Sequence, residues 1–206
     1  IIGSNQAIRN EVDLEFCALH EIQVIRRMSG GGAVYHDEGN LNYCFISNKM
    51  ANKPVLGSDF ILPIVEVLSA LGVPVTIGKR KDVWLTGEYK ISGTASHIGK
   101  MRELHHGTLL YDANLDALEN ALRSKSVDAT IKAITSVRST VKNLRDWFGE
   151  QGQFTLSSTE FFEFLAQKLV VYFQQEGYSA LTNIETKNIS ELAEKKYMSE
   201  EWTYKK

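Results

Sequence analysis

The chain has 206 residues, of which 43% are hydrophobic and 23% charged, and its formal net charge is −2. This composition is typical of a globular protein, and the lack of a basic excess argues against a nucleic-acid-binding domain. No apolar run approaches the ~18 residues that a membrane span needs. There are only two cysteines, Cys17 and Cys44, which favours a protein of a reducing compartment. They do not stand in a CxxC-type metal spacing, so no structural zinc site is expected.

The first third of the chain predicts three strands and a helix. Residues 22–28, 33–37 and 41–47 have strand-like sequences separated by short turns, so we expect them to pair as an antiparallel sheet. Residues 60–72 have apolar positions three and four apart and end at a glycine, which predicts a helix. Pro63 would lie in its first turn, where a missing N–H group costs little.

Hairpins and helices alternate in the remainder of the chain. Strands are predicted at residues 73–77 and 103–112, and a hairpin at 82–98 with its turn at 86–88. Helices are predicted at residues 114–124, 159–177 and 189–199. Because this order has no βαβ rhythm, we expect an α+β fold, a largely antiparallel sheet with packed helices, in one compact domain.

The stretch RRMSGGG, residues 26–32, combines two cations with three consecutive glycines. Glycine permits a positive φ and leaves no Cβ between the backbone and an approaching group. Consecutive backbone N–H groups in such a loop can bind anions, and arginine forks suit phosphate or carboxylate. The stretch therefore predicts a loop for an anionic substrate. The alternative is a tight turn with solvated arginines, and the spacing fits neither a Walker A loop nor a dinucleotide fingerprint.

Two further segments carry candidate binding residues. In EYKISGTAS, Lys90 and Ser92 would share one face of a strand, and a lysine in an apolar hairpin is costly to bury without an anion. The alternative is an exposed lysine. His105 and His106 are adjacent, so they point to opposite faces and cannot ligate one metal together. We favour a structural position for His105, whereas His106, beside Gly107, is a candidate for the substrate pocket.

Taken in order, four segments resemble the lipoate–protein ligases and the related lipoyltransferases. They are RRMSGGGAVYHDEGNLNYCF, KDVWLTGEYKISGTAS, LHHGTLLYDANLDAL and ITSVRSTVKNL. The resemblance covers most of the chain and implies the catalytic-domain fold shared with biotin–protein ligases and akin to class II aminoacyl-tRNA synthetases. It further implies that residues 1–206 are this catalytic domain, without the family's N-terminal segment and the small C-terminal domain of many members.

The resemblance also implies a two-step reaction that uses ATP, Mg²⁺ and lipoate. Lipoate and ATP would form lipoyl-adenylate and pyrophosphate. The lipoyl group would then pass to a lysine of a lipoyl domain, either of a 2-oxoacid dehydrogenase E2 subunit or of the glycine-cleavage H protein. The resemblance implies a cytoplasmic protein, or a mitochondrial one if the organism is a eukaryote. We expect neither a nucleic acid nor a membrane as partner.

Residue roles follow from the same resemblance, position by position. Lys90 would be the catalytic residue, in contact with the lipoate carboxylate and the α-phosphate. Asp82 would lie near the magnesium, although Lys81 stands where the family has asparagine. The implied ATP-binding residues are Arg27, Gly32, Ala33, Val34, Tyr35 and Lys90, and the implied lipoate-binding residues are Arg27, Ser29, His36, Lys90, Ala95 and His106.

A mixed anhydride must be kept from water, so we expect lids over the adenylate. Residues 99–103 and 124–138 are polar enough for this, and ITSVRS would close on the nucleotide. The lipoyl tail needs an apolar slot, for which the candidates are Val34, Leu41, Ile91 and Leu109, each equally compatible with the core.

Four other functions remain open from the sequence. A transferase of preformed lipoyl-nucleotide would share the whole pattern. An octanoyltransferase of the same fold would need no ATP but a cysteine nucleophile beside a lysine. A biotin–protein ligase would carry arginines between its glycines, and a non-catalytic module would keep the pocket alone.

Overall fold

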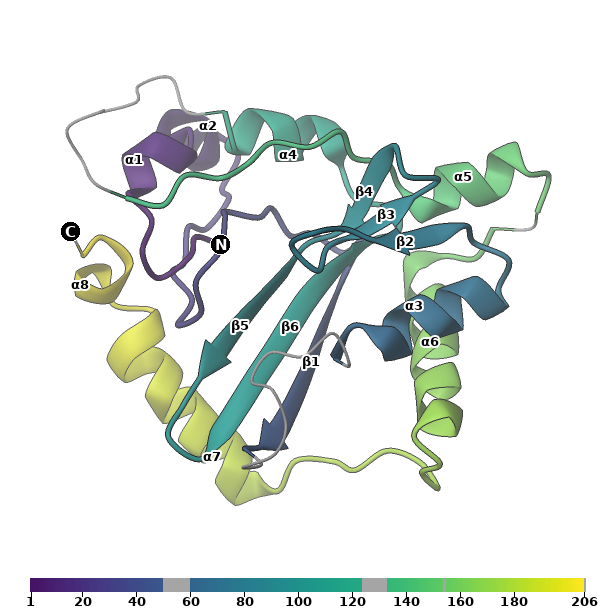
Figure 1. Ribbon diagram of the computed structural model, residues 1–206. Coiled ribbons are helices and arrows are strands. Elements are labelled where there is room, and N and C mark those ends of the chain that lie inside the picture. The colour runs from purple at the N-terminus through teal and green to yellow at the C-terminus, as the bar shows by residue number, and fades with distance from the viewer. Residues whose placement is uncertain (50–59, 124–132, 154, 206) are drawn as a thin grey trace. The chain divides into compact units, whose positions relative to one another are not determined.

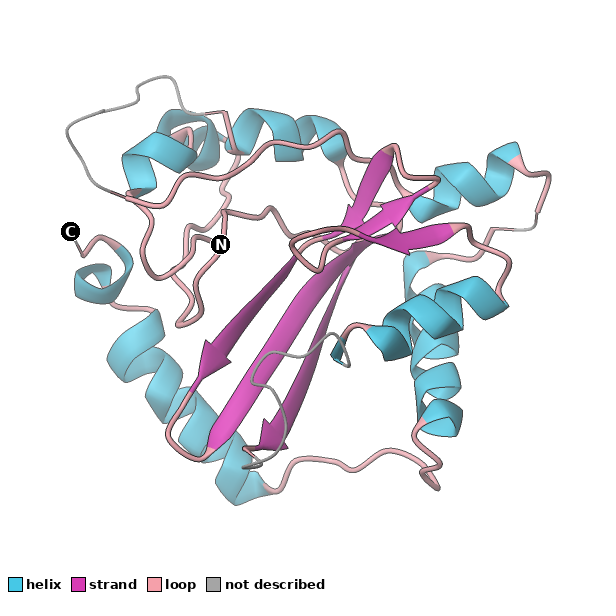
Figure 2. Ribbon diagram, in the orientation of Figure 1, coloured by secondary structure: helices cyan, strands magenta, loops and turns pink. Residues whose placement is uncertain are grey.

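The computed structural model describes residues 1–49, 60–123, 133–153 and 155–205. They form two compact units, each assembled from segments that are distant in sequence. Unit 1 comprises Ile1–Tyr35, Asp116–Val137 and Tyr178–Lys206, and unit 2 comprises His36–Leu115 and Arg138–Gly177. Helices and antiparallel strands together make an α+β protein, as expected (Figure 2).

Unit 2 contains two small antiparallel sheets. The longer one has the order β1 (Asn40–Asn48), β6 (Arg102–Leu110) and β5 (Thr94–Ile98), and the shorter one β2 (Val75–Ile77), β3 (Val83–Leu85) and β4 (Tyr89–Ser92) (Figure 1). Only Gly93 separates β4 from β5. The chain therefore passes from one sheet to the other within a single residue, next to the predicted Lys90 motif.

The core of unit 2 lies where these strands meet three helices, α3 (Leu62–Ala70), α5 (Leu144–Glu150) and α6 (Ser158–Tyr172). Helix α6 begins with a capping box, in which Ser157 and Glu160 bond each other's backbone N–H groups. Burial of apolar side chains stabilises the unit by roughly 25 cal/mol per Å² removed from water. The fully buried aliphatic residues of this core are Ile61, Ile64, Leu68, Val83, Leu85, Ile91, Leu109, Leu144 and Leu165.

Unit 1 has short helices and a small core. Its elements are α1 (Ile8–Glu11), α2 (Leu14–Leu19), α4 (Leu115–Ala121), α7 (Asn183–Leu192), the π-helical turn η2 (Ala193–Tyr197) and α8 (Glu200–Thr203), where α4 starts at the last residue of unit 2. Arg26 is 1% exposed, and its guanidinium donates to the carbonyl oxygens of Gly3, Gln6 and Thr203. One buried cation thus joins the first and the last segments of unit 1.

Most predicted elements are confirmed. Strand β1, helix α3 with Pro63 in its first turn, the β3–β4 hairpin and strand β6 lie where the patterns place them. The hairpin turn contains Thr86 and Gly87, with φ of 53° and 79°. The Glu88 N–H group bonds the Leu85 carbonyl oxygen at 3.1 Å, which closes a β-turn whose two central residues are left-handed, a conformation that glycine favours.

Residues 22–28 and 33–37 do not form the expected strands. Arg26 makes one isolated parallel bridge with Ile2, and the Val34 N–H group bonds the Ile1 carbonyl oxygen. The apolar residues Ile22 and Val24 instead pack on the small core of unit 1. Residue types typical of strands are also typical of buried loops, and a strand needs a partner ladder, which the structure does not show along these described stretches.

Helix boundaries differ more than helix positions. Helix α6 ends at Tyr172 rather than at 177, α7 starts at Asn183 rather than at 189, and α5 was not expected. The start of α7 is set by a capping box of Thr182 and Glu185, a Thr-x-x-Glu signature that the apolar pattern does not register. Among the helices described, none is both long and apolar enough to span a bilayer.

Candidate functional site

The glycine loop, residues 29–32, is held in unit 1 by the side chain of Arg27. The guanidinium donates to the carbonyl oxygens of Gly30 and Gly32, each at 2.7 Å, and to Ser29 Oγ at 3.1 Å. Burial lowers the pKa of Arg27 to about 10, which leaves it charged at neutral pH. In this structure Arg27 therefore fixes the shape of the loop, and an additional contact with phosphate stays a prediction.

The structure explains two of the three glycines in the loop. Gly31 has a φ of 86°, which strains other residues. A Cβ at Gly32 would lie 2.9 Å from Ser136 Oγ, closer than such atoms approach. A Cβ at Gly30 would meet nothing within 4 Å. Gly31 and Gly32 are thus required by the fold of unit 1, whereas Gly30 is not.

Ser136 is a residue of unit 1 that the sequence did not single out, although ITSVRS was part of the resemblance. Its Oγ accepts the Ala33 N–H group at 2.9 Å and the Gln6 Nε2 at 3.1 Å. Its own N–H group donates to the Glu11 carboxylate, 3.1 and 3.2 Å from the two oxygens. Within unit 1, Ser136 thus connects the predicted lid segment to the residue that follows the glycine loop.

The other predicted residues of unit 1 also serve its internal bonding. Ser29 is 2% exposed, and its carbonyl oxygen accepts the Ser4 N–H group at 2.9 Å. Tyr35 packs against the small core. The N–H groups of Ala33 and Val34 are both used within the unit. The backbone donors of the Gly30–Gly32 turn are thus the better candidates for an anion.

In unit 2, Lys90 forms an ion pair with Asp82, the residue before β3. Lys90 Nζ lies 3.6 Å from Asp82 Oδ2, and the two side chains are 22% and 5% exposed. Burial lowers the pKa of Lys90, and the Asp82 carboxylate opposes this shift. A largely buried ammonium with one carboxylate partner excludes the alternative of a lysine on the solvent face.

Three predicted lipoate-binding residues lie together in unit 2. In the β1–β6–β5 register, His106 is directly opposite both Cys44 and Ala95, so these side chains share one face of the sheet. Asn42, two residues from Cys44, holds His36 on that side through a contact of 3.3 Å to Nδ1. His36, Ala95 and His106 are therefore neighbours on this face, called below the His106 face.

Lys90 lies at the end of the His106 face. Thr108, two residues after His106, accepts the Gly93 N–H group on its Oγ1 at 3.2 Å. A Cβ at Gly93 would lie 3.5 Å from Lys90 Nζ and 3.8 Å from Thr108 Oγ1. The missing side chain of Gly93 thus leaves the ammonium next to the face that carries His106 and Ala95.

His105 points to the opposite side of the sheet. It is 2% exposed, its Nδ1 lies 2.8 Å from Ser96 Oγ, and its ring stacks on Phe60. Burial first, and then the charges of Lys81 and His106, lower the pKa of His105 to about 4. His105 is therefore a neutral structural histidine, the role that the sequence analysis favours for it.

Tyr43 of β1 forms a hydrogen bond to β4, the strand that carries Lys90. Its hydroxyl lies 3.0 Å from Ser92 Oγ, at the end of β4, and both residues are buried. A Cβ at Gly107 would overlap with this hydroxyl. Burial raises the pKa of Tyr43 to about 12, so the phenol keeps its proton. Gly107 therefore makes room for a hydrogen bond that fixes the chain at the start of the Ser92–Gly93 crossing.

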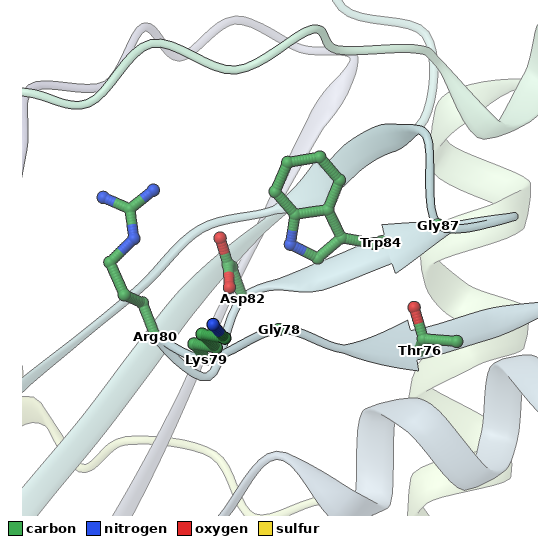
Figure 3. Close-up of a pocket in the computed structure, with 7 residues that line it drawn as sticks. All are labelled: Thr76, Gly78, Lys79, Arg80, Asp82, Trp84 and Gly87. Carbon is green, nitrogen blue, oxygen red and sulfur yellow. The ribbon is translucent and has the colours of Figure 1, made fainter.

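Asp82 also borders a surface depression of unit 2, lined by Thr76, Gly78, Lys79, Arg80, Asp82, Trp84 and Gly87 (Figure 3). The Asp82 carboxylate lies between Arg80 and the Trp84 ring. Within the described ranges, no three His, Cys, Asp or Glu side chains gather as a metal site. Magnesium commonly uses one or two carboxylates together with substrate phosphates. The single Asp82 carboxylate, beside Arg80, could supply one ligand to a magnesium ion that a nucleotide carries. It is too few protein ligands to bind magnesium without the nucleotide.

Three further expectations concern the predicted lids and the apolar slot. Residues 99–103 contain the tight β5–β6 turn, in which the Gly99 N–H group bonds the Arg102 carbonyl oxygen at 2.8 Å, and their role as a lid stays a prediction. Ile91 and Leu109 are fully buried core residues, so neither lines an apolar slot. The rest of the second predicted lid, 124–132, lies outside the described residues.

The cysteines give little support to an octanoyltransferase. Cys17 is buried in unit 1. Cys44 lies opposite His106, and desolvation of its thiol raises its pKa. A catalytic cysteine needs a lowered pKa, because the thiolate is the nucleophile.

Residues 1–170 match the family described as the lipoyl protein ligase A/B catalytic domain. The chain belongs to this family. The matched range includes both the glycine loop of unit 1 and the Lys90 strand of unit 2. The lipoyl protein ligase fold was implied by the four sequence segments, and that expectation is confirmed.

Individual proteins similar to this chain support the same family assignment. Lipoate–protein ligase 1 of Staphylococcus aureus is 37% identical over 204 residues, 99% of this chain and 60% of the relative. The mitochondrial lipoyl amidotransferase of Mus musculus is 34% identical over 185 residues, 89% of this chain and 48% of the relative. A crystal structure of lipoate–protein ligase A bound with ATP has a TM-score of 0.77 at 27% identity, covering 98% of this chain and 80% of that one. The chain thus spans about 60% of the length of its Staphylococcus relative.

Proposed function

We propose that this protein activates lipoate with ATP and transfers the lipoyl group to a lysine of a lipoyl domain. The observation that carries the proposal is the ion pair of the half-buried Lys90 with the buried Asp82, at the end of the His106 face. It supplies one fixed cation next to Ala95 and His106 of the same unit, for which the family resemblance implies lipoate contact. The proposed acceptors are lipoyl domains of 2-oxoacid dehydrogenase E2 subunits and the glycine-cleavage H protein.

In the first step the lipoate carboxylate attacks the α-phosphorus of ATP, and pyrophosphate leaves. Both reactants are anionic, so the protein must offset their repulsion and align them rather than supply a covalent nucleophile. Lys90 neutralises charge on the carboxylate and the α-phosphate, and the backbone N–H groups of the Gly30–Gly32 turn bind phosphate oxygens. Deleting one preorganised donor of this kind typically costs about 3–4 kcal/mol of transition-state stabilisation. Asp82 would hold a magnesium ion, which shields the phosphate charge.

In the second step the acceptor lysine attacks the carbonyl carbon of the adenylate, and AMP leaves. The attacking amine must be neutral, and its proton departs as the amide forms. Lys90 remains near the phosphate of the leaving AMP and stabilises its charge. The His106 face, with the small Ala95 at its centre, would lie along the acyl chain.

The proposal is tested by ATP–pyrophosphate exchange with lipoate and magnesium. Lys90→Met removes the ammonium but keeps the aliphatic stem. Lys142→Met is the matched control, because Lys142 also belongs to unit 2 and is also ion-paired, with Glu150 at 2.6 Å. We expect lipoate-dependent exchange that Lys90→Met lowers by at least roughly 100-fold and that Lys142→Met leaves nearly unchanged. Equal activity of both variants would reject the role of Lys90.

A second candidate is a transferase that only accepts preformed lipoyl-nucleotide. It is favoured by the similarity to the mouse lipoyl amidotransferase. The same preparation is offered synthetic lipoyl-adenylate and a lipoyl domain. Transfer without any pyrophosphate exchange would select this candidate over the full ligase.

A further inference from the structure

The hydroxyl group of Ser136 is held by three segments of unit 1. Ala33 follows the glycine loop, and its N–H group donates to Ser136 Oγ. Gln6 belongs to the segment before α1, and its Nε2 donates to the same oxygen. Glu11, the last residue of α1, accepts the Ser136 N–H group. Gln6 and Glu11 are only 3% and 5% exposed, so buried side chains fix both ends of Ser136.

The direction of these bonds is determined by the network. Gln6 Oε1 accepts the Gly3 N–H group at 2.9 Å, which identifies the other amide atom as the nitrogen. An amide NH₂ group can only donate, and so can the backbone N–H group of Ala33. Both lone pairs of Ser136 Oγ are therefore occupied by protein donors. A serine hydroxyl has two lone pairs and one proton, so its proton is left to point in the remaining direction.

No acceptor for that proton is found within the parts of unit 1 that the structure describes. Ser136 is half-buried, and its Oγ stands against the bare Cα of Gly32. The two donors that Oγ accepts polarise the hydroxyl and strengthen it as a donor. The Ala33 N–H group already donates to Ser136 Oγ and is not free for a ligand. The Ser136 hydroxyl proton is instead the donor that this part of the loop offers to a ligand.

We propose that Ser136 is a substrate-binding residue whose hydroxyl donates to an oxyanion at the glycine loop. The oxyanion is the phosphate of the nucleotide or the carboxylate of the acyl substrate. This assignment rests on the function proposed above and adds a side-chain donor to the backbone donors of the Gly30–Gly32 turn. Glu11 and Gln6 are positioning residues, since they act only through Ser136.

The experiment compares ligands that differ only in the oxyanion. Dissociation constants for AMP, adenosine, lipoate and lipoamide are measured by calorimetry on the full chain and on Ser136→Ala. A hydrogen bond to a charged group predicts roughly 10- to 100-fold weaker binding of one anion. Its neutral counterpart should change less than about twofold, because it offers no charged oxygen to the hydroxyl. Weakened AMP assigns the oxyanion to the phosphate, and weakened lipoate assigns it to the carboxylate.

Ser199→Ala is the matched control, because the Ser199 hydroxyl of unit 1 already donates to the Lys196 carbonyl oxygen at 2.7 Å. It should change none of the four constants. The proposal is overturned if Ser136→Ala weakens charged and neutral ligands equally, which is the result of a disordered loop. It is also overturned if Ser136→Ala changes nothing, or if the unsubstituted protein binds neither anion. These binding constants decide the matter even where pyrophosphate exchange fails, so the two proposals can fail separately.

Discussion

The hydroxyl groups of Tyr43 and Ser92 lie 3.0 Å apart in the interior of unit 2. This single bond joins the middle of β1 to the end of β4, two residues from Lys90. The position of the proposed catalytic ammonium thus depends on a tyrosine that need not contact any substrate.

Tyr43→Phe tests this dependence. The variant leaves the buried Ser92 hydroxyl without its partner, which costs about 1–3 kcal/mol of stability. We expect a lower kcat for pyrophosphate exchange with little change in the KM for lipoate, because the strand of Lys90 loosens. Tyr111→Phe is the control, since its buried hydroxyl bonds the Leu156 carbonyl oxygen in the same unit. A similar loss of stability in both variants with equal kcat would contradict the prediction.

The two glycines at the ends of the loop should respond differently to alanine. Gly32→Ala places a methyl group 2.9 Å from Ser136 Oγ, so it should separate residues 133–137 from the loop. Gly30→Ala meets nothing within 4 Å and should leave the loop intact. Hydrogen exchange at the Ala33 amide reports the difference directly. We expect at least roughly tenfold faster exchange in Gly32→Ala only, as one hydrogen bond is lost.

Arg27→Lys should damage the loop although it conserves charge. One guanidinium bonds the carbonyl oxygens of Gly30 and Gly32 together, whereas an ammonium is a point charge without that fork. We expect unfolding in urea to show a loss of about 1–2 kcal/mol. Exposed Arg123, also in unit 1, provides the control Arg123→Lys. Equal stability of the two variants would mean that charge alone matters at Arg27.

His105 makes stability depend on pH. Its pKa falls from 6.5 when unfolded to about 4 in the folded protein, so between these values the unfolded chain binds more protons. Stability is therefore unaffected above the unfolded pKa and decreases as pH falls through 6.5 towards 4. The contribution at pH 5 is a loss of about 2 kcal/mol relative to pH 7.5. Urea unfolding at both pH values should show this difference, and His105→Gln should reduce it. An undiminished pH difference in His105→Gln would exclude His105 as its source.

The sequence predicts the parts of this protein in which local pattern and burial agree. Strand β1, helix α3 and the β3–β4 hairpin have strong periodicity or a defined turn, so their positions are confirmed. The segments around Arg26 and Ala33 have strand-like sequences bounded by turn residues, which predict strands. Whether such a segment has a neighbour to pair with depends on residues far away in the chain, which no local pattern contains.

The same limit applies to the candidate site. Lys90, Ala95 and His106 could be placed by strand alternation, since neighbours on one face follow from pairing and parity. The roles of Ser136 and Tyr43 depend on bonds to Gln6 and Ser92, 130 and 49 positions away. The segment that contains Ser136 was recognised by resemblance, but its contact with the glycine loop required the fold.

Arg26 forms hydrogen bonds to residues far away in the sequence, which affects the order in which parts of the protein fold. Its carbonyl partner Thr203 lies 177 positions further along the chain. Closing so long a loop costs entropy before any contact compensates, and the partner emerges from the ribosome near the end of this sequence. We therefore expect the glycine loop to gain protection only after β1, β6 and β5 have paired. Pulse-labelled refolding would show this delay, and simultaneous protection of both units would disprove it.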